Sequence, residues 1–106
     1  MKDINVDDLC EEIVKLSTHK RQLHKTIEEL SEMIRAISRY LEDNNKEENI
    51  DNIFEELSHS IVMLKQTEFI LLKDLGEDKF FDKVEKWENN TIEDLEEVIE
   101  KLNLLQ

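Results

Sequence analysis

The sequence predicts an all-α protein, an antiparallel bundle of long helices that is completed by oligomerisation. The 106 residues contain no proline and one glycine, with 39% charged and 6% aromatic residues. Apolar residues recur at helical spacing over most of the chain, which leaves little room for a sheet. A chain of this length predicts a single domain over residues 1–106. Because it buries only a modest core alone, we expect a homo-oligomer, a dimer or a tetramer.

The charge balance is strongly acidic, with 14 Lys and Arg against 27 Asp and Glu and a formal net charge of −13. Nucleic-acid binding is not expected, because it requires basic side chains that neutralise phosphates. Carboxylates instead favour divalent cations. The single cysteine, Cys10, allows no intrachain disulfide, and no segment resembles a signal peptide or a membrane span. We therefore expect a cytoplasmic protein without a membrane partner.

The first predicted helix runs from about Asn5 to Glu42. Its apolar residues alternate at spacings of four and three, the 3.5-residue period of a bundle or coiled-coil seam. The polar residues 17–20 leave room for a kink or a loop, but we favour one long helix over two short ones. The seam consists of Leu9, Ile13, Leu16, Leu23, Ile27, Leu30, Ile34, Ile37 and Leu41.

Residues 43–49 are polar and rich in asparagine, which predicts the loop of a helical hairpin. A second helix is expected from about Ile50 to Leu75, with Gly76 at the C′ position that ends it. Its inward-facing residues are predicted to be Ile50, Ile53, Phe54, Leu57, Ile61 and Leu64, with Leu71 or Leu72.

The C-terminal part is predicted to form two further helical segments. The first covers residues 79–88 and is amphipathic, and Asn89-Asn90 is expected to break it. Thr91 then begins a sequence that resembles a capping box. The last helix is expected from Ile92 to about Leu105, with one apolar stripe.

Two similar five-residue segments carry the candidate chemistry. The first acidic motif is residues 28–32, Glu-Glu-Leu-Ser-Glu, and the second is residues 55–59, Glu-Glu-Leu-Ser-His. In a helix, residues i and i+3 share a face, so Glu29 lies with Glu32 and Glu56 lies with His59.

The two acidic motifs are expected to meet in the folded hairpin. With the loop centred near residue 46, they lie at the same height in antiparallel helices that rise ~1.5 Å per residue. At ~100° per residue, each motif also occupies the same flank of its helix, beside the seam. Three carboxylates and an imidazole that face one another form a metal site, whereas the same residues facing water form a solvated surface. The pattern alone leaves both interpretations open.

The two motifs, their apolar neighbours and the polar loop resemble the MazG-like nucleotide pyrophosphohydrolases over about residues 23–75. These all-α NTP pyrophosphatases carry Glu-Glu-x-x-Glu on one helix and Glu-x-x-Asp on the next. The resemblance implies Mg²⁺-dependent hydrolysis of a nucleoside triphosphate to a nucleoside monophosphate and pyrophosphate. It also implies Glu29, Glu32 and Glu56 as metal ligands, with Glu28 as a further ligand or as the catalytic base that orients water.

His59 stands where the family motif has aspartate. Its neutral ring offers one nitrogen to a metal, whereas Mg²⁺ prefers oxygen. His59 is then a ligand for Mn²⁺ or another transition metal, or a base or phosphate contact beside the glutamates. Alternatively the site is degenerate, and the bundle is a nucleotide-binding or protein-interaction and regulatory module. Whether the protein is an enzyme therefore depends on this residue.

Cations near the acidic motifs are candidates for binding the phosphates of a nucleotide. Lys25 lies one turn before Glu29 on the same flank and is the predicted substrate-binding residue. Lysines on helix surfaces more often only balance nearby glutamates. Arg35 and Arg39 follow the first acidic motif, and arginine suits bidentate phosphate recognition.

Overall fold

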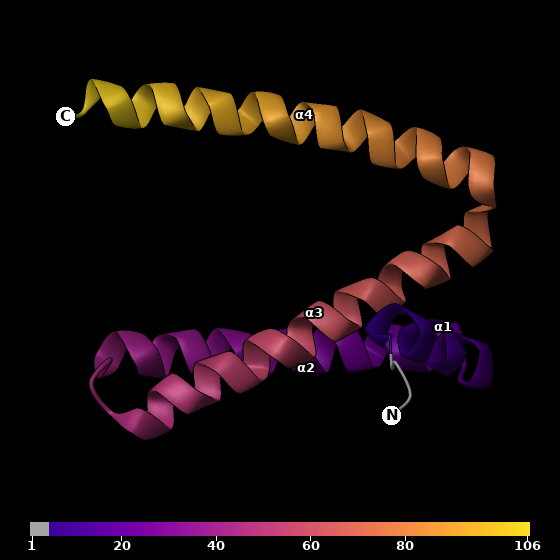
Figure 1. Ribbon diagram of the computed structural model, residues 1–106, viewed down its shortest axis with the longest axis horizontal. Helices are drawn as coiled ribbons and strands as arrows, with labels where there is room; N and C mark the ends of the chain where they lie inside the picture. The colour runs from indigo at the N-terminus through magenta and orange to yellow at the C-terminus, as the bar shows by residue number, and fades with distance from the viewer. Residues whose placement is uncertain (1–4) are drawn as a thin grey trace. The chain divides into compact units, whose positions relative to one another are not determined.

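The computed structural model describes residues 5–106, which form four α-helices and no strand (Figure 1). The predicted all-α class is therefore confirmed. The chain divides into two units, of which the first ends at Ile70 and the second runs from Leu71 to Gln106. Among the described residues, no helix has the length and hydropathy that crossing a membrane requires. The helices are α1 (Val6–Leu16), α2 (His19–Glu42), α3 (Glu47–Leu75) and α4 (Glu77–Leu104).

α1 and α2 are separate helices, so the prediction of one helix from residue 5 to residue 42 is wrong. Capping explains the break. The side chain of Thr18 accepts a hydrogen bond from the backbone N–H of Arg21 at 3.1 Å, and this satisfies one of the free amides at the start of α2. Ser17 ends α1 in an extended conformation, with φ −110° and ψ 172°. At the start of α1, Asn5 accepts from the N–H of Asp7 at 2.8 Å.

α2 and α3 form an antiparallel hairpin, and its turn lies in the polar loop predicted from the sequence (Figure 1). The carboxylate of Asp43 accepts a hydrogen bond from the N–H of Asn45 at 3.1 Å. The side-chain amide of Asn49 donates to the carbonyls of Arg39 at 3.2 Å and Asp43 at 3.0 Å. Because Asn49 lies in the first turn of α3, it ties the two helices together at the turn. α3 begins at Glu47, slightly before the predicted start.

The hairpin helices touch along one row of each helix, which we call the contact row. Many of its side chains are small or polar, so the helices hydrogen-bond across the interface. Gln22 Nε2 donates to Gln66 Oε1 at 2.7 Å, and the hydroxyl oxygens of Thr26 and Thr67 lie 3.4 Å apart. The buried residues of the contact row are Gln22, Thr26, Glu29, Ala36, Glu56, Ser60, Met63, Gln66 and Ile70.

The apolar residues predicted to form the seam lie outside this interface. Ile27, Ile34 and Phe54 are 63%, 65% and 65% exposed. The prediction that these residues form the interior seam within a single chain is therefore wrong. The seam and the contact row share the same 3.5-residue period but differ by one residue, or ~100° around the helix.

α1 packs against α3 in the first unit. Its buried apolar residues are Cys10 and Val14. The thiol of Cys10 lies 3.6 Å from the carbonyl oxygen of Val62, and Lys65 Nζ lies 2.6 Å from Asp7 Oδ1. These contacts place α1 beside the same stretch of α3 that supplies the C-terminal half of the contact row.

The second unit consists of the end of α3, Gly76 and α4. Gly76 has φ 84° and donates its N–H to the carbonyl of Leu72 at 2.9 Å, so the predicted end of this helix is confirmed. α4 is continuous through Asn89-Asn90, so the predicted break there is wrong. The Thr91 hydroxyl, expected in a capping box, instead donates to the carbonyl of Trp87 at 2.7 Å within the helix.

Candidate metal centre

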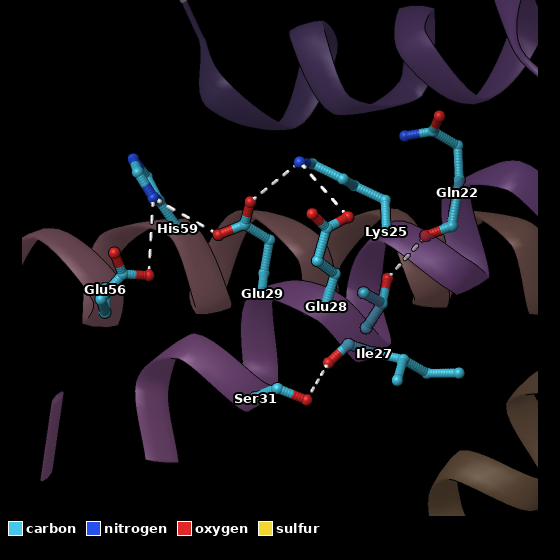
Figure 2. A network of polar contacts seen from close by, with 9 residues as sticks. Gln22, Lys25, Ile27, Glu28, Glu29, Ser31, Glu56 and His59 are labelled. Carbon is cyan, nitrogen blue, oxygen red and sulfur yellow. Dashed lines mark hydrogen bonds and ion pairs between the residues drawn. The ribbon is translucent and has the colours of Figure 1, made fainter. Parts of the chain in front are cut away.

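Glu29 on α2 and Glu56 and His59 on α3 converge between the two helices (Figure 2). Each residue offers one ligand atom, and these atoms all lie within 4.8 Å of one another. The i, i+3 spacing of Glu56 and His59 directs both toward α2, and the antiparallel hairpin places Glu29 opposite them. The structure thus brings together three of the four predicted metal ligands, and their role as ligands stays a prediction.

Both glutamates of this cluster are buried, each with 8% of its surface exposed. The inner oxygens, Glu29 Oε2 and Glu56 Oε2, have no hydrogen-bond partner. His59 Nδ1 lies 3.5 Å from Glu29 Oε2 and 3.8 Å from Glu56 Oε2, which is too long for a good hydrogen bond. Buried carboxylate oxygens without partners are costly, so a cation bound at this point would stabilise the fold.

The distances from His59 Nδ1 to the two inner carboxylate oxygens suit a small divalent cation. Ligands at ~2.1 Å from an octahedral ion lie about 3.0 Å apart when adjacent and about 4.2 Å apart when opposite. The two distances from His59 Nδ1, 3.5 and 3.8 Å, fall within this range. Two carboxylates and one imidazole suit Mn²⁺ better than Mg²⁺, which prefers oxygen ligands alone.

Glu32, the fourth predicted ligand, lies beside the cluster. Its pKa is raised above the ordinary value, mainly by the charge of Glu29, with smaller contributions from burial and from Glu56. Its carboxylate is therefore close enough to sense both buried charges. Within the described residues, the group that meets the ligand spacing contains Glu29, Glu56 and His59 but not Glu32.

Lys25 and Glu28 lie at the outer edge of the cluster (Figure 2). Lys25 Nζ lies 3.2 Å from Glu29 Oε1 and 3.7 Å from Glu28 Oε2. The hydrogen bond with Glu29 and the charge of Glu28 raise the pKa of Lys25. Lys25 thus neutralises the outer oxygen of Glu29, while Glu28 is exposed and faces Lys25 rather than the three ligand atoms. The predicted substrate-binding role of Lys25 and catalytic role of Glu28 stay predictions.

A polar cleft of about 260 Å³ adjoins the cluster. Both arginines that follow the first acidic motif line it, together with two of the acidic residues. The cleft also contains Asn52, which the sequence reasoning did not assign. Asn52 precedes Glu56 by four residues and so lies on the same face of α3. This spacing is the sequence signal that could have identified it. The lining residues are Glu32, Arg35, Arg39, Asn52 and Glu56.

The resemblance to the MazG-like family stays a prediction. No family model matches the sequence, and no curated protein or solved structure is significantly similar to it.

Proposed function

We propose that the protein is a metal-dependent nucleotide hydrolase of the MazG-like type, which converts a nucleoside triphosphate to a nucleoside monophosphate and pyrophosphate. One observation carries this proposal: two buried carboxylate oxygens, on Glu29 and Glu56, lack partners and face the imidazole of His59. A buried polar atom left without a partner calls for an explanation.

In this proposal, some residues of the cluster bind the cation and another orients one of these ligands. Glu29 Oε2, Glu56 Oε2 and His59 Nδ1 supply the three ligand atoms. Lys25 binds the other oxygen of Glu29 at 3.2 Å, which orients that carboxylate with Oε2 toward the cluster. The bound metal supplies neutralisation of phosphate charge and a lowered pKa for a water molecule.

The adjoining cleft supports an anionic substrate. Arg35 and Arg39 line it together with Glu32 and Glu56. A chain with a net charge of −13 repels phosphates in general, so a triphosphate needs a local concentration of cations. Guanidinium groups bind phosphate oxygens in pairs, and here they lie next to the carboxylates that hold the metal.

The test is a hydrolysis assay on metal-free protein supplied with Mn²⁺ or Mg²⁺ and a panel of canonical and modified nucleoside triphosphates. We expect release of monophosphate and pyrophosphate, and its loss in Glu56→Gln. Glu55→Gln is the matched control, because Glu55 is the exposed neighbour on the same helix. Absence of both turnover and a nucleotide-dependent rise in Tm would exclude the proposal.

A second candidate function is nucleotide binding without turnover, and His59 is the observation that favours it. An imidazole in place of a carboxylate removes one negative charge from the ligand set, which weakens binding of Mg²⁺. His59→Asp distinguishes the two functions. If the wild-type protein binds nucleotide without hydrolysing it, and His59→Asp gains Mg²⁺-dependent hydrolysis, the natural site is a binding site.

A further inference from the structure

Ser60 on α3 is buried, and its hydroxyl has no hydrogen-bond partner among the described residues. The residue is 5% exposed, and its Oγ is one of three buried side-chain oxygens that the described part of the chain leaves without a partner. The other two are the inner carboxylate oxygens of Glu29 and Glu56. A buried hydroxyl without a partner loses its hydration and gains no bond in return, so its presence here requires an explanation.

Other helical hydroxyls in this chain avoid that loss by bonding within their own helix. Five Ser and Thr side chains each donate to the backbone carbonyl four residues earlier, at 2.7–3.2 Å. Ser60 makes no such bond to the carbonyl of Glu56. Its hydroxyl therefore remains available for a group outside the backbone of α3. The five residues that bond within their helices are Thr26, Ser31, Ser38, Thr67 and Thr91.

Ser60 lies at the level of the candidate metal centre. It belongs to the contact row, which faces α2, and it follows Glu56 by one helical turn on the same face of α3. The residue before it, His59, brings Nδ1 to 3.5 Å from Glu29 Oε2. The turn of α3 that contains Ser60 therefore lies beside Glu29, and Ser60 faces the interface at the height of the three ligand residues.

The three oxygens without partners are chemically complementary. A serine hydroxyl donates one hydrogen, whereas ionised carboxylates only accept. The side chain of Ser60 turns about a single torsion with three staggered positions, so its hydroxyl changes acceptor without movement of the backbone. One buried donor in the same interface as two buried acceptors is the combination that a hydrogen bond between them would satisfy.

The surroundings of the two carboxylates favour Glu29 as the acceptor. Glu29 lies on α2, across the interface that Ser60 faces, whereas Glu56 lies on the same helix as Ser60. Lys25 Nζ already binds the outer oxygen of Glu29 at 3.2 Å, and Figure 2 shows this carboxylate between Lys25 and His59. The oxygen of Glu29 that still lacks a donor is therefore the inner one, Oε2.

We propose that Ser60 is a positioning residue for the cation, and that its hydroxyl donates a hydrogen bond to the inner oxygen of Glu29 when the cation is bound. One carboxylate oxygen serves both, because it has two lone pairs. Glu29 is then held from two sides, by Lys25 at the outer oxygen and by Ser60 at the inner one. Hydrogen bonds to a ligating carboxylate fix its direction and strengthen metal binding. The inference rests on the proposed function, because it requires that Glu29 binds a cation.

A role for Ser60 in helix spacing alone does not account for its hydroxyl. Small side chains in the contact row allow the helices to approach closely, and Ala36 does this without a polar side-chain atom. Alanine at position 60 would allow the same approach and would leave no buried hydroxyl without a partner. The hydroxyl itself is therefore explained by the site and not by the packing.

The affinity for Mn²⁺ alone tests the proposal, measured by isothermal titration calorimetry on metal-free protein without nucleotide. We expect Ser60→Ala to bind Mn²⁺ at least about tenfold more weakly than wild type, the usual effect of removing a hydrogen bond to a metal ligand. Ser58→Ala is the matched control, because Ser58 is an exposed serine two residues away on the same helix, and its affinity should be that of wild type. Equal affinities of Ser60→Ala and wild type overturn the proposal.

Two further measurements separate the hydrogen bond from packing. Ser60→Cys keeps nearly the same size but has a weak donor in place of the hydroxyl, so its Mn²⁺ affinity should stay close to that of Ser60→Ala. Wild-type affinity in Ser60→Cys would mean that the residue acts through its volume, which overturns the proposal. In EDTA, the Tm of Ser60→Ala should not fall below that of wild type, because the hydroxyl has no partner within the described chain. A lower Tm would mean that the hydroxyl stabilises the fold itself, which also overturns the proposal.

The proposed function and the role of Ser60 fail in different ways. A wild-type protein that binds no Mn²⁺ overturns both. If wild type binds Mn²⁺ and hydrolyses a triphosphate while Ser60→Ala binds Mn²⁺ equally well, the function stands and the role of Ser60 is overturned. If Ser60→Ala weakens Mn²⁺ binding but wild type hydrolyses no triphosphate, the role of Ser60 stands and the proposed hydrolysis is overturned.

Discussion

Glu56→Gln is expected to make the metal-free protein more stable. The substitution adds no contact, but it removes a buried negative charge that lies close to Glu29. One oxygen each of Glu29 and Glu56 lies within 4.8 Å of the other. Two unit charges at this separation repel by about 3.5 kcal/mol at an effective dielectric constant of about 20. Glutamine keeps the shape of the side chain and loses the charge.

Only part of this repulsion is recovered by the substitution. Lys25, 3.2 Å from Glu29 Oε1, already neutralises much of the charge of Glu29. His59 lies 3.8 Å from Glu56 and attracts it when protonated. We therefore expect a gain of about 1 kcal/mol in the free energy of unfolding, which raises Tm by about 4–8 °C in a chain of this size.

The assay is thermal unfolding followed by circular dichroism, first in EDTA and then with Mn²⁺. A cation that binds only the folded state at about a hundred times its Kd stabilises it by about 2.7 kcal/mol. The Tm of the wild-type protein should therefore rise when Mn²⁺ is added, whereas the Tm of Glu56→Gln should not. Glu55→Gln, the exposed control, should leave both measurements within about 0.5 kcal/mol of wild type.

The opposite result in EDTA would refute the reasoning. If Glu56→Gln lowers the Tm of the metal-free protein, the carboxylate of Glu56 is held by favourable contacts within the chain. The missing hydrogen-bond partner of Glu56 Oε2 would then be no evidence for a metal centre.

Two further predictions concern the elements around the site. Thr18→Ala removes the cap of α2 and should lower the free energy of unfolding by about 1 kcal/mol in urea titrations, whereas Thr18→Ser should not. Asp7 raises the pKa of Lys65 above 10.5 through their hydrogen bond, so the stability from this pair is present below pH 10.5 and lost as pH rises through the pKa of folded Lys65. Asp7→Asn should therefore reduce the decline of Tm over this alkaline range, and an unchanged pH profile would count against the pair.

The height of the cluster in the hairpin was predictable, because it follows from the spacing within each acidic motif and from the distance of each motif to the loop. The i, i+3 spacing within the second acidic motif and the matched distances of both motifs from the loop determine which side chains meet. His59, Glu56 and Glu29 follow from these two facts. Glu32 was predicted equally well by spacing, but it lies one turn further along α2 and ends up in the cleft beside the cluster.

The contact row was not predictable from periodicity. The seam and the contact row of each helix both repeat every 3.5 residues, and the seam carries the stronger hydrophobic signal. The period identifies a row but does not say which neighbour it faces. Ala36 and Ser60 face the other helix because their small side chains allow close approach. The break at Thr18 was missed for a related reason, since the apolar period continues across it.

Burial of Glu29 and Glu56 in the contact row requires something to hold the hairpin closed against their repulsion. Part of the stabilisation that keeps the two helices together comes from hydrogen bonds such as that between Gln22 and Gln66. These bonds lie toward the far end of the contact row from the turn, so they do not screen the carboxylates themselves. A bound cation would do so directly, because it would replace repulsion between the two glutamates by attraction of both to one centre. The burial of Glu29 and Glu56 in the contact row, with one oxygen of each left without a partner, is what the proposed cation would explain.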